Sequence, residues 1–411
     1  MQQYSDTVWT LKQNPTGPLV IHLDVFAAHL ESLGFCRRYI GGQLRVVANF
    51  SRWLRMRKIS TRKLRNKHIV DFLSAENQSK AISGGKYAAL NRLITFLHDR
   101  DICVRPVLKK KQTQTQIIVE DFGQYLVDER NLSPKTRIQY CPIITRFLTK
   151  RFKLRTTDLA QISAADIIGF IRREAGQCSI ARAKVATNAM RAFIRYGIHR
   201  CGVAPNLSGA TPSVASWSMT DIPKAISPTD VQAILSACSR NTPIGQRDYA
   251  ILLLLARLGL RAGEIVALTL DNIDWGTGSI FVVGKFGKST VLPLPEDVGE
   301  AISNYLLHGR PCVQDRTLFL RSIAPIRPLG AQQTIATVVN AAIKRAGVSP
   351  PTRGAHQFRH ALATDLLTQG ASLAEIGRIL QHQHSKTTNI YTKVDIKALR
   401  ELSIPWPGGA L

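Results

Sequence analysis

The last 170 residues of this 411-residue chain carry guanidinium, amine, imidazole and phenol side chains whose types suit one reaction. They are Arg261, Lys285, His356, Arg359, His382 and Tyr391. Attack on a phosphodiester builds negative charge on its nonbridging oxygens, and two always-protonated guanidinium groups can hold those oxygens bidentately. A tyrosine hydroxyl, with a pKa of about 10, becomes a nucleophile only beside a base and positive charge. A histidine can carry the proton, and a lysine can protonate the leaving oxygen.

Each of these features alone indicates little. A lone arginine after a helix is usually a solvated charge, and a tyrosine at a helix end is most often half-buried packing. His356 and His360 could ligate zinc, but the pair lacks the glutamate of H-E-x-x-H and has no third ligand at a suitable spacing. We therefore expect no metal and no cofactor, because side chains would supply the positive charge.

Apolar patterning predicts the elements that position these groups. Residues 245–258 are expected to form a buried helix, with Arg261 shortly after its end. Two β-rich runs, 279–283 and 289–294, enclose a glycine- and lysine-containing segment and predict a hairpin with a basic tip. His356 and Arg359 share one face of a helix because they are three residues apart. The expected helices after the hairpin are 297–307, 331–346, 356–369, 372–380 and 386–392.

The first half of the chain reads as two copies of one helical unit. Ser51-Arg-Trp-Leu54 recurs as Thr145-Arg-Phe-Leu148, and His68-Ile-Val-Asp-Phe-Leu73 recurs as Asp166-Ile-Ile-Gly-Phe-Ile171. Any two amphipathic helical stretches share some such pattern, which is the alternative. The expected layout is an extension over 1–17, a helical domain over 18–106, a linker over 107–116, a second helical domain over 117–206, a linker over 207–225, a mixed domain over 226–394 and a tail over 395–411.

Composition indicates a polyanionic partner. Lys and Arg outnumber Asp and Glu by 55 to 28, for a net charge of +27, which excludes an ordinary metabolic enzyme as the default. The longest apolar run is far shorter than the about 20 residues of a membrane helix, and no signal peptide is evident. Seven singly placed cysteines indicate reduced thiols. We expect a cytoplasmic, nucleoid-associated protein with no membrane partner.

The order of these residues and the sequence motifs around them resemble those of the tyrosine recombinase (phage integrase) family. Gly259-Leu-Arg-Ala-Gly-Glu264 resembles its first arginine motif, and Val282 to Leu294 resembles its hairpin with the catalytic lysine. His356-Gln-Phe-Arg-His360 resembles its H-x-L-R-H box, and Leu380 to Tyr391 resembles its L-G-H-x-x-x-x-T-T-x-x-Y stretch. The segment Asn131 to Tyr140 resembles the first helices of the family's core-binding domain. The likeness covers about 120–400.

The resemblance implies a role for each matching residue. Tyr391 would attack the scissile phosphate and form a 3′-phosphotyrosyl bond, while Arg261 and Arg359 would hold the phosphate. Lys285 would be the general acid toward the 5′ oxygen, with Lys288 as its rival. The resemblance implies three further roles. His356 would handle the tyrosine proton, and His382 would donate a hydrogen bond to the phosphate. Glu264 would hold Arg261, or the site around it, in position without contacting the substrate.

Two positions depart from the family's pattern. Gln381 stands where the family usually has glycine, and Phe358 replaces the usual leucine.

DNA contacts are expected from the core-binding segment, the hairpin tip and the basic clusters of the first domain. The alternative for those basic clusters is a solvated helix face. The candidates are Lys135, Thr136, Arg137, Lys288, Arg55 and Arg62.

The expected protein is a mainly α, multi-domain DNA clamp with a small antiparallel sheet in its C-terminal catalytic domain. It would act on double-stranded DNA as a homo-oligomer, a dimer to a tetramer, with sister recombinases as further candidate partners. The tail would contact a neighbouring protomer. Integration, excision or transposition of a mobile element would be its role. The alternatives are a type IB topoisomerase, a catalytically inactive DNA-binding protein and a metal-dependent nuclease.

Overall fold

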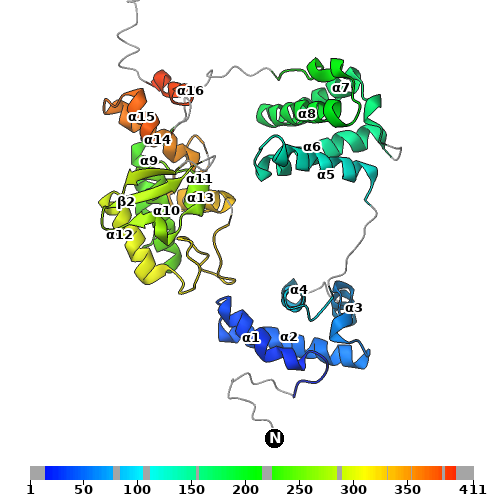
Figure 1. The fold of residues 1–411 in the computed structure, drawn as a ribbon. Coiled ribbons are helices and arrows are strands. Elements are labelled where there is room, and N and C mark those ends of the chain that lie inside the picture. Colours follow the sequence, from blue (N-terminus) through cyan, green and yellow to red (C-terminus); the bar gives the residue numbers. More distant parts are fainter. Residues whose placement is uncertain are drawn as a thin grey trace, which may run out of the picture. The chain divides into compact units, whose positions relative to one another are not determined.

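The computed structural model describes residues 14–76, 84–104, 112–153, 157–214, 225–284, 289–330, 332–352, 354–381 and 385–394. Helices dominate these residues, and one three-stranded antiparallel sheet lies in the C-terminal part, which confirms the expected fold class. The chain divides into two compact units, 1–105 with 221–411 and 106–220 (Figure 1). The predicted domain boundaries and the clamp arrangement stay predictions.

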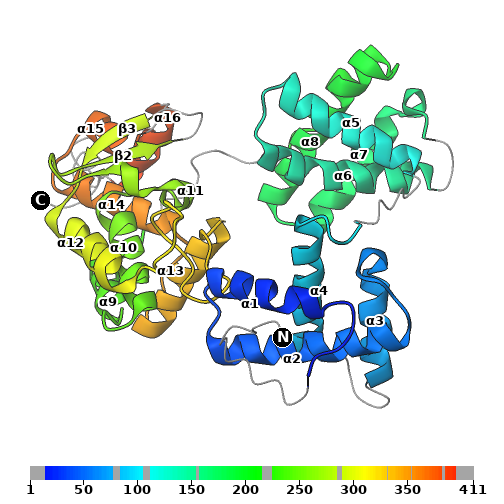
Figure 2. The same ribbon diagram turned by 60° about the horizontal axis from the view of Figure 1, so that its bottom comes forward.

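The first helical part encloses its own apolar core. Helix α1 packs on α2, and α4 packs on both α2 and α3 (Figure 2). Phe26, Phe50 and Trp53 are among the buried residues of this core. A 3-10 turn precedes α1 and another joins α2 to α3. The bounds are α1 Leu23–Ser32, α2 Arg37–Met56, α3 Asn66–Glu76 and α4 Gly84–Asp99.

The unit formed by 106–220 is a second helical bundle with a separate core. Thr113 begins α5 with a capping box, since its hydroxyl accepts from the Gln116 backbone N–H and the Gln116 side chain accepts from the Thr113 N–H. Helix α6 begins at Pro134, where the missing N–H is not needed. The bounds are α5 Gln114–Asp128, α6 Pro134–Phe152, α7 Ala164–Gln177 and α8 Ile180–Arg200.

The C-terminal part begins as the sequence indicates, with Ser227 capping a helix whose first residue is Pro228. The expected helix over 386–392 is present, as one α-helical turn that continues into a 3-10 helix. The α-helices here are α9 Pro228–Ser236, α10 Pro243–Arg257, α11 Ala262–Ala267, α12 Glu296–Asn304, α13 Gln332–Ala346, α14 His356–Thr368, α15 Leu373–Ile379 and α16 Ser385–Thr388, followed by the 3-10 helix η8 Asn389–Val394.

The small sheet has the order β1-β2-β3. β2 (Ser279–Val283) and β3 (Ser289–Pro293) form the predicted hairpin, in which Phe281 lies opposite Val291. β1 (Ile273–Asp274), which the sequence analysis missed, pairs with the start of β2. Ile280 and Val282 point into the core while Phe281 and Val283 are exposed, so the sheet has one buried face.

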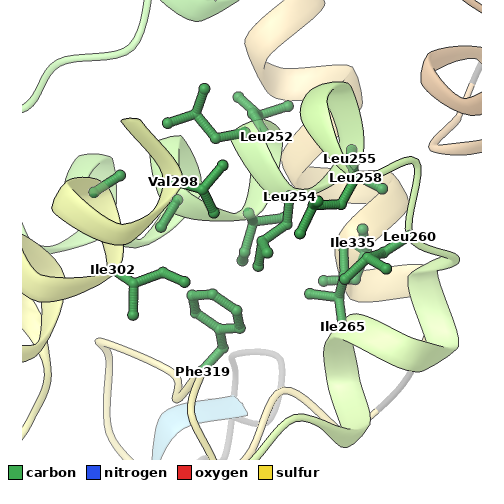
Figure 3. Close-up of a cluster of buried hydrophobic side chains, with 14 of the residues drawn as sticks. Leu252, Leu254, Leu255, Leu258, Leu260, Ile265, Val298, Ile302, Phe319 and Ile335 are labelled. Carbon is green, nitrogen blue, oxygen red and sulfur yellow. The ribbon is translucent and has the colours of Figure 1, made fainter. Parts of the chain in front are cut away.

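Helix α10 lies at the centre of this part and is apolar on nearly every side. Leu252, Leu254 and Leu255 are at most 1% exposed, and they meet residues of α11, α12 and α13 in one cluster (Figure 3). Burial of each such side chain contributes about 1.5–3 kcal/mol. The core therefore fixes the end of α10, from which Arg261 follows.

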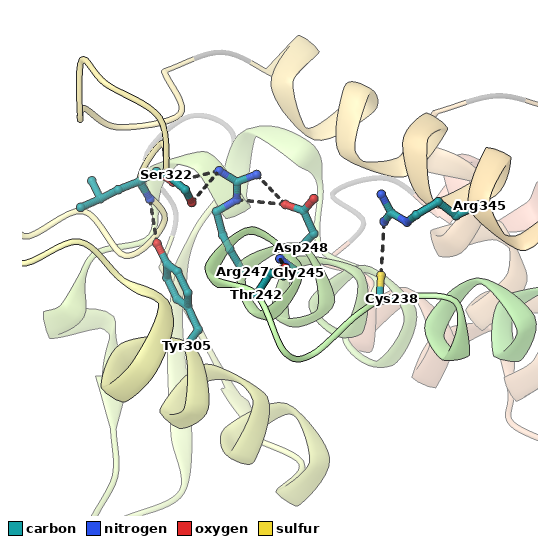
Figure 4. A network of polar contacts seen from close by, with 9 residues as sticks. Cys238, Thr242, Gly245, Arg247, Asp248, Tyr305, Ser322 and Arg345 are labelled. Carbon is teal, nitrogen blue, oxygen red and sulfur yellow. Dashed lines mark hydrogen bonds and ion pairs between the residues drawn. The ribbon is translucent and has the colours of Figure 1, made fainter. Parts of the chain in front are cut away.

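A buried ion pair supports the same helix. Asp248 on α10 accepts from the Arg247 Nε at 2.9 Å, and Arg247 also donates to the Leu320 carbonyl at 3.2 Å (Figure 4). The Leu320 N–H in turn donates to the Tyr305 hydroxyl at 3.2 Å. Desolvation raises the pKa of Asp248, and the Arg247 charge opposes that rise. This network ties α10 to the loop around 320.

No described helix is both long and apolar enough to cross a membrane. All seven cysteines lie within the described residues, and none of them forms a disulfide.

Candidate active site

The corner between α10 and α11 places Arg261. Gly259 adopts a φ of +59°, a conformation that glycine takes at little cost. A Cβ on Gly259 would lie 2.9 Å from a Leu380 methyl and 3.0 Å from a Leu362 methyl. Because the chain turns here without a side chain, α14 and the residues after α15 can approach the end of α10 closely.

Glu264 fixes Arg261 at the start of α11. Its carboxylate accepts from the Arg261 backbone N–H at 2.8 Å and from the Arg261 guanidinium at 2.6 Å. Glu264 is 5% exposed, whereas the Arg261 side chain is 37% exposed. The buried carboxylate therefore orients a guanidinium group that still faces solvent.

Arg359 is anchored by backbone carbonyls on both sides. It lies on α14, is 3% exposed, and donates to the Gly259 carbonyl at 2.7 Å and to the Leu380 carbonyl. The Gly259 carbonyl is two residues before Arg261, so this bond joins the two arginines' segments. Five N–H groups in a planar fork allow Arg359 to make these contacts and to keep donors for a further ligand.

The charges of this region act on one another. Desolvation, together with the nearby positive charge of Arg261, lowers the pKa of Arg359 to about 10. His356 is exposed to solvent, yet the protein atoms around its ring partly desolvate it, and His360 and the two arginines add to the effect, so its pKa is lowered to about 4. The imidazole of His356 is thus neutral at pH 7, and the pocket's positive charge comes from the arginines.

Tyr391 lies against the same helix. It is 2% exposed on η8 and packs with Ala363, Ile376 and Leu380. Its Oη is 3.0 Å from Nδ1 of His360, and the two rings meet edge to face with centroids 5.7 Å apart. Burial raises the pKa of Tyr391, and the charge of Arg359 opposes that rise, so the phenol is protonated at neutral pH.

His360 is the residue of this site that the sequence analysis quoted but gave no role. Its ring lies between those of Tyr391 and His356, with a centroid distance of 4.5 Å to His356. Burial and the charge of Arg359 lower the pKa of His360, which favours the neutral imidazole. Its position four residues after His356 places both on one helical face, which was the available signal.

The structure brings together five of the predicted site residues, namely Arg261, Glu264, His356, Arg359 and Tyr391, around the ends of α10, α14 and η8. Lys285, Lys288 and His382 lie outside the described residues, as does the tail over 395–411. Gln381, where the family usually has glycine, has a φ of +53°, which gives a physical reason for that preference.

The candidate DNA-contact residues lie elsewhere. Lys135 is exposed at the start of α6, where Thr136 is 3.3 Å from the Ser133 hydroxyl and Arg137 forms an ion pair with Glu120 at 2.5 Å. Arg55 and Arg62 are exposed in the first helical part.

Among the described residues, no group of three or more His, Cys, Asp or Glu side chains is placed to hold a metal ion. What the described site does offer is a phenol, two neutral imidazoles and two guanidinium groups. This set can bind a phosphate, supply a nucleophile and accept its proton.

Comparisons with known proteins agree with this chemistry. The phage integrase family matches residues 224–397, and the SAM-like N-terminal domain of phage integrases matches residues 119–200. The protein named "Putative integrase/recombinase y4rA" from Sinorhizobium fredii is 41% identical over 411 residues, which cover 100% of both chains. Tyrosine recombinase XerD of Listeria monocytogenes is 29% identical over 293 residues, covering 69% of this chain and 96% of that protein.

Solved structures share the fold. XerH site-specific recombinase bound to a palindromic difH substrate, in a post-cleavage complex, has a TM-score of 0.56 and 17% identity, covering 88% of this chain and 96% of that chain. The Tn1549 transposon integrase in complex with transposon right end DNA has a TM-score of 0.54 and 16% identity, covering 69% and 98%. At such identities the likeness concerns the fold alone.

Proposed function

The chain belongs to the phage integrase family of tyrosine recombinases, and from that membership we propose that it cuts and rejoins duplex DNA through the phenol of Tyr391. The observation that carries the proposal is the convergence of Tyr391, His360, Arg359 and Arg261 at one place. A nucleophile, a neutral base and two fixed cations are what a phosphoryl transfer without ATP requires.

The reaction conserves bonds in each step. The Tyr391 oxygen attacks the phosphorus of one strand, the bond from phosphorus to the 5′ oxygen breaks, and a 3′-phosphotyrosyl linkage and a free 5′ hydroxyl result. A 5′ hydroxyl from a second strand then attacks the phosphotyrosyl linkage and releases the phenol. Because one phosphate ester replaces another each time, the energy of the broken bond is retained.

Arg261 and Arg359 hold the phosphate in this proposal. Arg359 is oriented by two backbone carbonyls and Arg261 by Glu264, so neither guanidinium has to be ordered when charge develops on the nonbridging oxygens. His382 would add a hydrogen bond to the same phosphate.

Protons move through the imidazoles. We assign the phenol proton first to His360, because its Nδ1 is within hydrogen-bond distance of the Tyr391 oxygen. His356, which adjoins His360 and is exposed, then connects that proton to solvent. This assignment refines the expectation that His356 alone handles the tyrosine proton. Lys285, with Lys288 as its rival, would protonate the departing 5′ oxygen.

The substrate is double-stranded DNA, bound by an oligomer. XerH is bound to a palindromic substrate, and lambda integrase forms a dimer on a core site. A palindromic site matches two-fold symmetry between protomers, so we propose a dimer that pairs into a tetramer on two sites. Relatives named as an integrase/recombinase and a transposon integrase favour integration, excision or transposition of a mobile element, in the cytoplasm.

A single set of assays separates this function from the alternatives. The substrate is a nicked duplex carrying the sequence that the purified protein selects from a random pool, so that cleavage traps a covalent adduct. We expect an adduct that persists with EDTA and recombination between two plasmid-borne sites. Relaxation of any supercoiled plasmid would indicate a topoisomerase, EDTA sensitivity a metal nuclease, and binding without an adduct an inactive DNA-binding protein.

A further inference from the structure

The first helical part, residues 19–104, repeats the architecture of the bundle formed by α5 to α8. In each, a long second helix is followed by a 3-10 turn, a third helix and a fourth helix. Backbone with positive φ also recurs at the matching junctions. The pairs are Gly34 and Asn131 before the second helix, Lys58 and Lys153 after it, and Asp101 and Gly202 after the fourth.

The aromatic contacts of the two cores also correspond. Phe26 and Phe96 have ring centroids 5.2 Å apart, and Phe122 and Phe193, at the matching positions, are 5.3 Å apart. Trp53 meets Phe72 edge to face at 66°, and Phe147 meets Phe170 at 67°. Independent amphipathic helices would share apolar spacing but not the same ring pairs between the same helices, so the likeness is a duplication.

One matched position changes the charge of the surface. At the start of α7, Asp166 accepts from the Ser163 backbone N–H at 3.0 Å and forms an ion pair with Arg151 at 2.8 Å. At the start of α3, Nδ1 of His68 accepts from the Arg65 backbone N–H at 3.1 Å. The cap is therefore kept in the first copy, but the carboxylate that neutralises an arginine is replaced by an imidazole.

Basic side chains are frequent in the segment that leads into this corner, residues 55–67. We call it the α2–α3 basic surface, and its members are Arg55, Arg57, Lys58, Arg62, Lys63, Arg65 and Lys67. All seven are exposed, and no Asp or Glu occurs from 55 to 67. Within the described part of the chain, none of the seven forms an ion pair. Exposed cations at this density repel one another, and a polyanion that binds there relieves the repulsion.

We propose that residues 19–104 are a second core-binding domain and that the α2–α3 basic surface binds the sugar-phosphate backbone of double-stranded DNA, beyond the segment that α5 to α8 contact. Helices α1–α4 repeat the arrangement of α5–α8. The replacement of the carboxylate of Asp166 by the imidazole of His68 leaves the basic side chains nearby without that negative charge. Phosphate contacts of this kind raise affinity and lengthen the bound site without reading its sequence. The proposal does not depend on the assignment of the nucleophile.

The test is DNA binding by the full chain, measured by fluorescence anisotropy on a mixed-sequence duplex of about 60 bp over a KCl series. The neutralised variant is Arg62→Gln, Lys63→Gln and Arg65→Gln together. The matched control is Arg62→Lys with Arg65→Lys, which keeps every charge. These side chains are exposed, so neither variant removes a buried contact.

We expect the neutralised variant to bind at least about tenfold more weakly, and the slope of log affinity against log salt to become shallower by about 2–3, because each lost phosphate contact removes about 0.9. The lysine control should resemble the unmodified protein. Equal affinity and slope in all three proteins would overturn the proposal. Loss of self-association with unchanged DNA binding would also overturn it, by assigning the surface to protein contacts.

Discussion

The Nδ1 atom of His360 lies 3.0 Å from the phenol oxygen of Tyr391. This contact joins α14 to η8, two elements that each carry part of the proposed chemistry. It places a neutral imidazole, and not solvent, next to a phenol whose pKa is raised by burial. In the proposed mechanism, this contact pairs the nucleophile with its first proton acceptor before DNA is bound.

Replacing His360 separates orientation from proton transfer. Asparagine can keep a hydrogen bond to the phenol but cannot take its proton, whereas leucine can do neither. If His360 accepts the proton, both His360→Asn and His360→Leu lower the rate of adduct formation by about 100-fold or more. The rate is measured in a single turnover on the nicked duplex. A normal rate with asparagine would limit His360 to positioning.

The pH dependence of His356 has a definite sign. Its pKa is lowered to about 4 in the folded protein, so the folded state favours the neutral ring. Above about pH 6.5, the pKa of an unfolded histidine, the ring is neutral in both states and the protein keeps its full stability. As the pH falls from about 6.5 toward 4, only the unfolded state takes up the proton, so the free energy of unfolding decreases. NMR titration of the imidazole should show a midpoint near 4 without DNA and a higher one with a bound phosphate. A DNA-free midpoint at or above 6.5 would contradict the proposed environment.

Much of the catalytic part could be predicted from sequence because its elements are local. The apolar run of α10, the strand–lysine–strand pattern of β2 and β3, and the spacing of His356 and Arg359 each act within one element. Short sequence motifs that recur in α1–α4 and in α5–α8 also predicted the likeness between these two sets of helices. These signals follow from periodicity and turn chemistry alone.

Substitution of Gly259 tests how the arginines are held. Gly259→Ala introduces a strained φ and pushes on Leu380, whose carbonyl accepts from Arg359. We expect a stability loss of about 1–2 kcal/mol from the backbone and about a tenfold slower adduct formation. Thermal unfolding and the single-turnover assay measure the two effects.

Gly347→Ala is the matched control for that substitution. Gly347 has a similar φ of +67°, but a Cβ there would have no atom within 4 Å. It should lose a comparable stability and keep its rate of adduct formation. Equal rates in both variants would show that the contact with Leu380 does not position Arg359.

Glu264 should act through Arg261 and not on DNA directly. Glu264→Gln can still accept from the Arg261 backbone N–H, but it removes the buried negative charge that pairs with the guanidinium. We expect about a tenfold slower adduct formation with unchanged DNA affinity, since the phosphate clamp is less well oriented. An unchanged rate of adduct formation would show that Glu264 does not position Arg261 for the reaction.

The contacts that complete the site were beyond the reach of sequence. His360 meets Tyr391 only because η8 packs against α14, and Arg359 finds the Gly259 carbonyl only because α14 crosses the end of α10. Tertiary contacts between segments as much as 100 residues apart leave no periodic trace in the sequence.

Covalent trapping is the most direct test of the proposal that Tyr391 is the nucleophile of DNA cleavage. The unmodified protein, Tyr391→Phe and Tyr249→Phe are each incubated with the nicked duplex, and the adduct is resolved by denaturing electrophoresis. We expect an adduct with the unmodified protein and with Tyr249→Phe, and none with Tyr391→Phe, which should still bind the duplex. An adduct that persists in Tyr391→Phe would show that another residue is the nucleophile.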